Sequence, residues 1–171
     1  MKLYHVSEEP DIAEFHPRPS PQVYDSVKGN VVFAVSEDML HNYLLPRECP
    51  RVTFYAKADS TAADIEKFIG NSEKKFIINV EECRLESIKK GILYLYKLPA
   101  EDFELLDEGA GYYVSYKSVK PSEVIVIDDI LEELKRDNVE LRVLHSIRKL
   151  AEDIAKSSLQ YSIIRLRNAK S

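Results

Sequence analysis

Alternating hydrophobic and polar positions predict strands in the first 128 residues of the chain. Runs rich in β-branched and aromatic residues recur there, with shorter polar stretches between them. We expect strands over residues 2–7, 30–36, 51–56, 74–82, 91–99, 111–119 and 122–129. Because only a Lys-Pro link separates the last two runs, we expect these two strands to be neighbours in the sheet.

Two segments among these strands have helical spacing of their apolar residues. Residues 36–45 begin with Ser36, a good N-cap, continue with two acidic residues in the first turn, and end before Pro46. Residues 60–70 resemble a second capped helix, which Gly70 closes. We therefore expect short helices between some of the strands.

The long segment 8–30, between the first two strands, is expected to be an irregular loop. It contains four prolines, and proline lacks the backbone N–H that a regular helix or a central strand needs. Three apolar residues, Ile12, Phe15 and Val23, are expected to pin the loop to the core. Loops of this length within a compact domain are often functional, and the apolar residues favour an ordered loop.

The pattern changes after Asp128. Residues 128–138 predict a helix with an aspartate-rich start, and residues 139–157 predict a longer helix from the spacing of their leucines and isoleucines. Residues 158–171 are basic and fit either a helix or a strand, with helix favoured. The order predicts an α+β fold with a mixed or antiparallel sheet and a C-terminal helical cap. We expect one structural unit, in which the helices of 129–171 pack on an α+β domain of residues 1–128.

Composition and charge narrow the possible functions. The chain has 171 residues, of which 44% are hydrophobic, and a net charge of −5, which argues against general nucleic-acid binding and against a membrane partner. Cys49 and Cys83 match no paired-cysteine motif, and the histidines lack metal-ligand spacing, so no metal is expected. No apolar segment approaches the ~20 residues that span a bilayer, and the start does not read as a signal peptide. We expect a cytoplasmic protein.

The first strand carries two groups that could bind a ligand, His5 and Ser7. Residues two apart in a strand face the same side, so both side chains can reach one cleft. An imidazole and a hydroxyl together suit a polyol such as a ribose. The structural alternative is a hydrogen-bonded strand histidine followed by a turn or capping serine.

The opening LYHVS, followed by VVFAVSEDMLHNYL and much later by GYYVSYKSVKPSEVIVID, resembles the three motifs of the ADP-ribosyltransferase fold in the same order. The resemblance covers residues 3–128 and implies an ADP-ribosyltransferase-like sheet that binds NAD. The opening also resembles a bacterial family for which no activity is assigned. Transferred to this sequence, the resemblance implies that His5 bonds the hydroxyls of the nicotinamide ribose and that Ser7 assists it.

The same resemblance assigns further residues to the cofactor. Phe33 would lie in the strand that floors the nicotinamide pocket, Ser36 would match the serine that opens the following helix, and Tyr43 would stack on a ring. An arginine fork binds phosphate in a bidentate manner, so Arg18 or Arg47 could hold the pyrophosphate. The alternative for each arginine is a solvated surface charge or an ion pair.

Two departures from the family pattern leave catalysis open. Val32 stands where the family has a stacking tyrosine, and Gly111 aligns with the catalytic glutamate that stabilises the oxocarbenium charge. RNA 2′-phosphotransferases share the fold and work without that acid. The first hypothesis is therefore an NAD-like nucleotide-binding protein that transfers an ADP-ribosyl or phosphoryl group to an unidentified acceptor, with no catalytic residue assigned. The alternative is a non-catalytic binding or interaction module that retains the fold.

Overall fold

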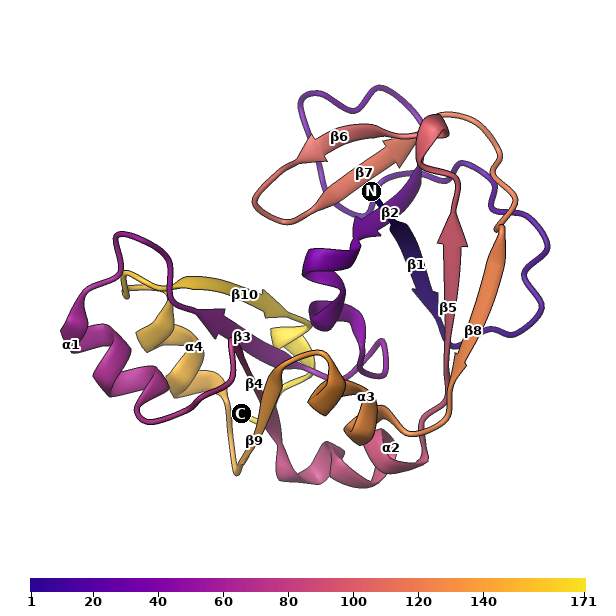
Figure 1. The fold of residues 1–171 in the computed structure, drawn as a ribbon. Helices are drawn as coiled ribbons and strands as arrows, with labels where there is room; N and C mark the ends of the chain where they lie inside the picture. The colour runs from indigo at the N-terminus through magenta and orange to yellow at the C-terminus, as the bar shows by residue number, and fades with distance from the viewer. The chain divides into compact units, whose positions relative to one another are not determined.

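The computed structural model describes all residues, Met1–Ser171, and confirms the α+β class. The chain forms two compact units, each with its own sheet (Figure 1). The first unit contains residues 1–40 and 92–127, and the second contains residues 41–91 and 128–171. Each unit is therefore built from two separate stretches of sequence.

The first unit is a six-stranded antiparallel sheet with the order β6-β7-β2-β1-β5-β8 (Figure 1). Its strands are β1 Leu3–Ser7, β2 Val32–Ser36, β5 Leu93–Leu98, β6 Glu104–Asp107, β7 Tyr112–Ser115 and β8 Glu123–Ile127. A 3-10 turn, Ala100–Asp102, links β5 to β6. Five of these strands confirm the expected positions, with shorter bounds, whereas β6 was not predicted.

The expectation that the last two of these strands are neighbours is wrong. β7 pairs with β2 and β6, so both of its edges are occupied, and β8 pairs with β5 at the other side of the sheet. The link between them is therefore a crossover and not a turn. Val119, within this link, pairs with Phe15, and the N–H of Ser122 then donates to the Lys97 carbonyl, where β8 begins.

One face of the six-stranded sheet carries the core of the first unit, and the loop 8–30 covers it. Phe15 packs on this face and exchanges two backbone hydrogen bonds with Val119, with N···O distances of 2.8 and 2.9 Å. Ile12 packs against the same core, whereas Val23 is 97% exposed and does not pin the loop. The ordered loop with apolar anchors is thus confirmed for two of its three expected anchors.

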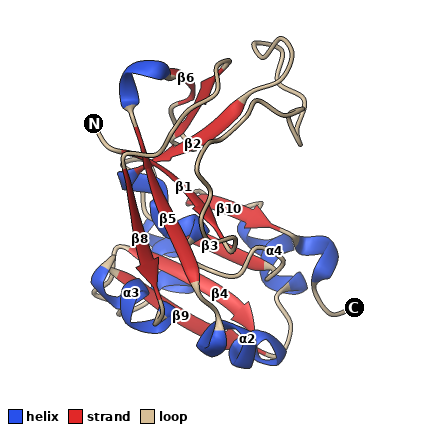
Figure 2. Ribbon diagram, turned by 90° about the vertical axis from the view of Figure 1, so that its right-hand side faces the viewer, coloured by secondary structure: helices blue, strands red, loops and turns tan.

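The second unit has a four-stranded sheet with the order β10-β3-β4-β9, in which only β4 and β9 are parallel. Its strands are β3 Arg51–Tyr55, β4 Phe76–Glu81, β9 Val139–Leu144 and β10 Gln160–Ile164. The helices are α1 Ala62–Asp64, which continues as a π-helix over Ile65–Ile69, then α2 Leu85–Lys90, α3 Ile130–Arg136 and α4 Arg148–Ile154 (Figure 2). None of these helices has the length and the apolar character that crossing a membrane requires.

Two of the expected C-terminal helices are wrong. Residues 139–157 form β9 and the short helix α4, and residues 158–171 form β10 and a 3-10 turn, Leu166–Asn168. Every residue of β4 is buried, so this strand needs a partner on each edge, and β3 and β9 supply them. Non-local strand pairing therefore outweighs the helical spacing of the leucines.

The residues predicted to begin or end the other helices are confirmed. The Asp129 carboxylate accepts a hydrogen bond from the Glu132 N–H at 3.0 Å and caps α3, and Thr61 caps α1 in the same way. Gly70 ends the π-helix with a positive φ of 62°. The segment after Ser36 is helical as expected, but as a 3-10 helix, Glu37–Tyr43.

Candidate functional site

β1 places His5 and Ser7 on the core face of the first unit. Alternation puts both side chains on the same side as Leu3, which belongs to the core beneath the loop 8–30. In the register with β5, His5 lies opposite Tyr96 and Ser7 lies opposite Tyr94. Both His5 and Ser7 are half-buried, so each remains within reach of a small polar ligand.

The His5 ring is held by a hydrogen bond and an aromatic contact. Its Nδ1 lies 3.1 Å from the Phe33 carbonyl oxygen. A carbonyl can only accept, so Nδ1 carries a proton and donates in this contact. The Phe15 ring packs against the imidazole with 4.7 Å between centroids. The tautomer and the orientation of His5 are therefore both set by the fold.

Ser7 forms the local turn that the sequence left as an alternative. Its Oγ accepts a hydrogen bond from the Glu9 N–H at 3.1 Å, at the start of the loop 8–30. Such a side-chain turn directs the chain out of β1. Because a serine hydroxyl also carries a donor hydrogen, this contact is compatible with a ligand at Ser7.

Phe33 lies on the opposite face of the sheet from His5. Its neighbours Val32 and Ala34 both point into the core with Leu3, and strand alternation sends the Phe33 ring the other way. There it meets Tyr24 and Tyr112, with centroid distances of 6.3 and 6.4 Å. Only the Phe33 carbonyl reaches His5, so the structure does not bring the Phe33 ring to the His5 side.

Ser36 lies beside Gly111, the position that aligns with the missing catalytic acid. The Ser36 N–H donates to the Gly111 carbonyl at 2.8 Å. Gly111 has a φ of +66°, and a Cβ added there would lie 2.5 Å from the Ser36 Oγ and 2.8 Å from the Met39 Cγ. Contacts this short leave no free space for a Cβ, so a side chain at this position would have to displace the side chains of Ser36 and Met39.

The remaining candidate residues are dispersed. Arg18 forms a backbone bridge with Val31, with N···O distances of 3.0 and 2.9 Å, and its side chain is exposed. Tyr43 and Arg47 belong to the second unit, where Tyr43 is half-buried and Arg47 is exposed. Within the first unit, His5, Ser7 and Ser36 lie on one face of β1 and β2, with Ser36 opposite Leu3 at one end of β1 and Ser7 at the other end.

The second unit contains a buried arginine with a structural role. Arg51 is 2% exposed, and its guanidinium donates to four carbonyl oxygens at 2.9 to 3.2 Å. Burial lowers the pKa of Arg51, and its guanidinium is hydrogen-bonded to carbonyls. The acceptors are the carbonyls of Asn42, Pro46, Arg47 and Cys49. Arg51 therefore organises the loop between the 3-10 helix and β3.

Tyr96 is a residue of the candidate site that sequence reasoning did not single out. Its ring is fully buried, and its hydroxyl donates to the Glu9 carbonyl at 2.6 Å and accepts from the Ile12 N–H at 3.2 Å. It also makes an edge contact with Phe15 at 5.2 Å. Tyr96 thus fixes the loop over the strand that carries His5. The available signal was its place on the face of an alternating strand.

A model described as a family of unknown function, DUF6886, matches residues 4–169. The chain belongs to the DUF6886 family. No curated protein and no solved structure matches it. Because the match begins just before His5 and continues through β10, both units of this DUF6886 protein lie inside the family's matched region.

The chemistry that this DUF6886 chain can supply at β1 is hydrogen bonding. His5 offers an acceptor nitrogen in its neutral form, and Ser7 offers a hydroxyl. The structure has no group of three or more His, Cys, Asp or Glu side chains that could hold a metal ion. The groups at β1 are therefore ones that can form hydrogen bonds with hydroxyl groups.

Proposed function

We propose that this DUF6886 protein binds an NAD-like nucleotide on the first unit, with His5 as the residue that recognises a ribose. The observation that carries this proposal is the hydrogen bond from Nδ1 to the Phe33 carbonyl. It directs the Nε2 lone pair of a neutral ring to accept from a hydroxyl donor. Ser7, two residues along the same strand face, adds a second polar group for a neighbouring hydroxyl.

We infer that binding, and not acid-assisted ADP-ribosyl transfer, is the activity of this site. A retaining or inverting displacement at a ribose carbon develops positive charge, which a nearby carboxylate would stabilise. Gly111 carries no such group, and a side chain there would have to adopt a positive φ and displace those of Ser36 and Met39. This favours the alternative of a binding module over an enzyme that uses an acid at position 111.

The loop 8–30 determines how a nucleotide would reach His5. Phe15 packs on the imidazole and is only 9% exposed, and Tyr96 ties the start of the loop to β5. We infer that the ligand enters by displacing part of this loop. The amides of the loop should therefore respond to the ligand together with those of β1.

Calorimetric titration of NAD tests the proposal, with His5→Ala as the variant and His145→Ala as the control. His145 is an exposed histidine of the second unit, bonded to Glu82 and outside the loop 8–30. We expect NAD to bind the wild-type protein and His145→Ala equally. Loss of a hydrogen bond to the ribose should weaken binding to His5→Ala by about tenfold.

Titration with fragments of NAD shows which part of the nucleotide is recognised. ADP-ribose should bind nearly as well as NAD, and nicotinamide alone should not bind, because the recognised groups are ribose hydroxyls. Thermal unfolding by circular dichroism shows whether His5→Ala remains folded at the titration temperature. Equal affinity of His5→Ala and the wild type, or no binding of NAD to the wild type, would contradict the proposal.

A further inference from the structure

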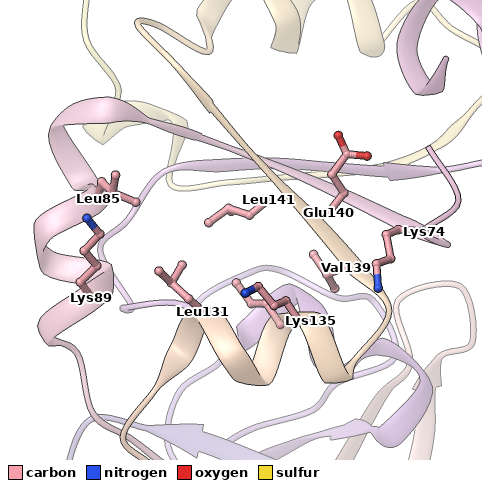
Figure 3. A pocket seen from close by; sticks show the side chains of 9 residues that line it. Lys74, Leu85, Lys89, Leu131, Lys135, Val139, Glu140 and Leu141 are labelled. Carbon is pink, nitrogen blue, oxygen red and sulfur yellow. The ribbon is translucent and has the colours of Figure 1, made fainter. Parts of the chain in front are cut away.

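The second unit contains a hollow that the proposed nucleotide site does not use. It has a volume of about 470 Å³ and lies between α2, α3 and the start of β9 (Figure 3). Pockets of roughly 300–1,000 Å³ are the usual size for small-molecule sites. The walls are regular elements in mutual contact, since α3 packs on both α2 and β9. The hollow is therefore a defined feature of the fold.

The lining of the hollow is mainly aliphatic. Leu134 and Val139 are buried beneath it, at 1% and 3% exposure. Leu85 from α2, Leu131 from α3 and Leu141 from β9 are half-buried and surround the space (Figure 3). Partly exposed leucines on three elements form an apolar surface, and covering it with a nonpolar ligand removes apolar area from water.

Positive charge surrounds this apolar surface. Lys74, Lys89 and Lys135 line the hollow, from the segment before β4, from α2 and from α3 respectively (Figure 3). Lys89 lies 3.7 Å from Glu86 on the exposed side of α2, whereas Lys74 and Lys135 form no ion pair. These ammonium groups can therefore bind an external anion.

The single acid in the lining does not cancel these charges. The Glu140 carboxylate already accepts a hydrogen bond from the Arg142 Nε at 2.9 Å. This bond, followed by one from Ser72, keeps the pKa of Glu140 below its ordinary value, so the carboxylate stays paired and ionised. The hollow is thus positive in a protein whose net charge is −5.

We propose that this hollow binds a medium-chain carboxylate, with the aliphatic chain among the leucines and the carboxylate held by the lysines. Lysine ammonium groups act as mobile point charges, which suits a single carboxylate that needs no fixed planar fork. The inference is independent of the nucleotide proposal, because all its residues belong to the second unit.

A purely structural role of the lysines makes a different prediction. Lys89 and Lys135 lie in the last turns of α2 and α3, where cations complement the helix dipole, and lysine stems commonly cover apolar surface. In that case the lysines and leucines would complete the surface without any ligand. Titration with ligands that share a chain and differ in charge separates the two roles.

Calorimetry with decanoate, decanol and decylammonium on the full chain provides the test, with backbone amide chemical shifts to locate binding. We expect decanoate to bind and to shift the amides of 131–141, decanol to bind more weakly, and decylammonium not to bind. Lys135→Glu and Lys89→Glu should each weaken decanoate binding by about fivefold, as expected for one partly exposed ion pair. Lys90→Glu is the matched control, because Lys90 is exposed on α2 and does not line the hollow.

A substitution that changes no charge tests the apolar part of the hollow. Leu131→Trp should fill the hollow and abolish decanoate binding, while thermal unfolding reports whether the unit stays folded. No binding of decanoate to the wild type would overturn the proposal, and so would equal binding of decanol. An equal loss of affinity in Lys90→Glu and Lys135→Glu would also overturn it, because the attraction would then be a general surface effect.

Discussion

Alanine substitution of three glycines tests the claim that position 111 excludes any side chain. Gly111 has both a positive φ of +66° and a Cβ position 2.5 Å from the Ser36 Oγ. Gly29 has a positive φ of +94° but no atom within 4 Å of an added Cβ. At Gly109 an added Cβ meets only Asp107, at an ordinary 3.5 Å. The three positions separate backbone strain from steric overlap.

The expected losses of stability follow from backbone strain and steric overlap. A left-handed backbone costs an L-residue about 1–2 kcal/mol, and forcing a methyl group into a packed site costs about 1–3 kcal/mol. Gly111→Ala should therefore lower the free energy of unfolding by about 2–5 kcal/mol, and Gly29→Ala by about 1–2 kcal/mol. Gly109→Ala should stay within about 0.5 kcal/mol of the wild type. For a chain of this size, the loss in Gly111→Ala corresponds to a decrease in Tm of roughly 4–20 °C.

Urea unfolding followed by circular dichroism measures all three variants. If Gly111→Ala loses no more stability than Gly29→Ala, the Ser36 and Met39 contacts do not restrict the site, and the steric argument is refuted. The same assay applies to Gly111→Glu, in which the acid of the transferase pattern is restored. We expect this variant to be destabilised at least as strongly and to gain no ADP-ribosyl transfer.

Three further predictions concern the groups that hold loops in place. Tyr96→Phe should cost about 1–3 kcal/mol, since it removes two part-buried hydrogen bonds, and amide hydrogen exchange at Ile12 should accelerate. Arg51→Lys should cost about 3 kcal/mol in urea unfolding, because an ammonium cannot reach four carbonyls, whereas the same change at the exposed Arg167 should be neutral. Hydrogen bonds from Ser158 lower the pKa of Asp64, so this carboxylate stabilises the fold above its unfolded pKa of 3.8 and the effect is lost as pH falls further. Asp64→Asn should therefore destabilise the protein at pH 7 and much less at pH 3; equal effects at both pH values would exclude this linkage.

The elements that sequence reasoning predicted correctly depend on local signals. β1 with His5 and Ser7, the capped helix after Asp129, and the proline-rich loop pinned by Phe15 all follow from residues close together in the chain. The wrong assignments depend on distant partners. Residues 139–144 alternate with a period of two at Val139, Leu141 and Val143, but the leucine spacing also fits a helix, and only pairing with β4 decides between them.

The residues of the candidate site also fall into those that local sequence predicts and those that depend on distant contacts. That His5 and Ser7 share a face follows from strand alternation and needs no structure. The same rule, applied to Val32, Phe33 and Ala34, already placed the Phe33 ring away from its neighbours, so this separation could have been predicted from the sequence. The roles of Tyr96 and Arg51 could not be predicted in this way. Their acceptors are backbone carbonyls that the loops bring near, and every residue has such a carbonyl.

The position of Gly111 limits what chemistry the first unit can acquire. Its carbonyl accepts from Ser36 at the end of β2, and its positive φ turns the chain into β7, so it serves the strand pairing that also supports His5 through Phe33. Introducing an acid there would disturb the strand that pairs with β2, whose Phe33 carbonyl holds His5. Any transfer reaction of the kind proposed would therefore have to stabilise charge through other groups. A DUF6886 protein that binds NAD but does not hydrolyse it is the outcome that this coupling predicts.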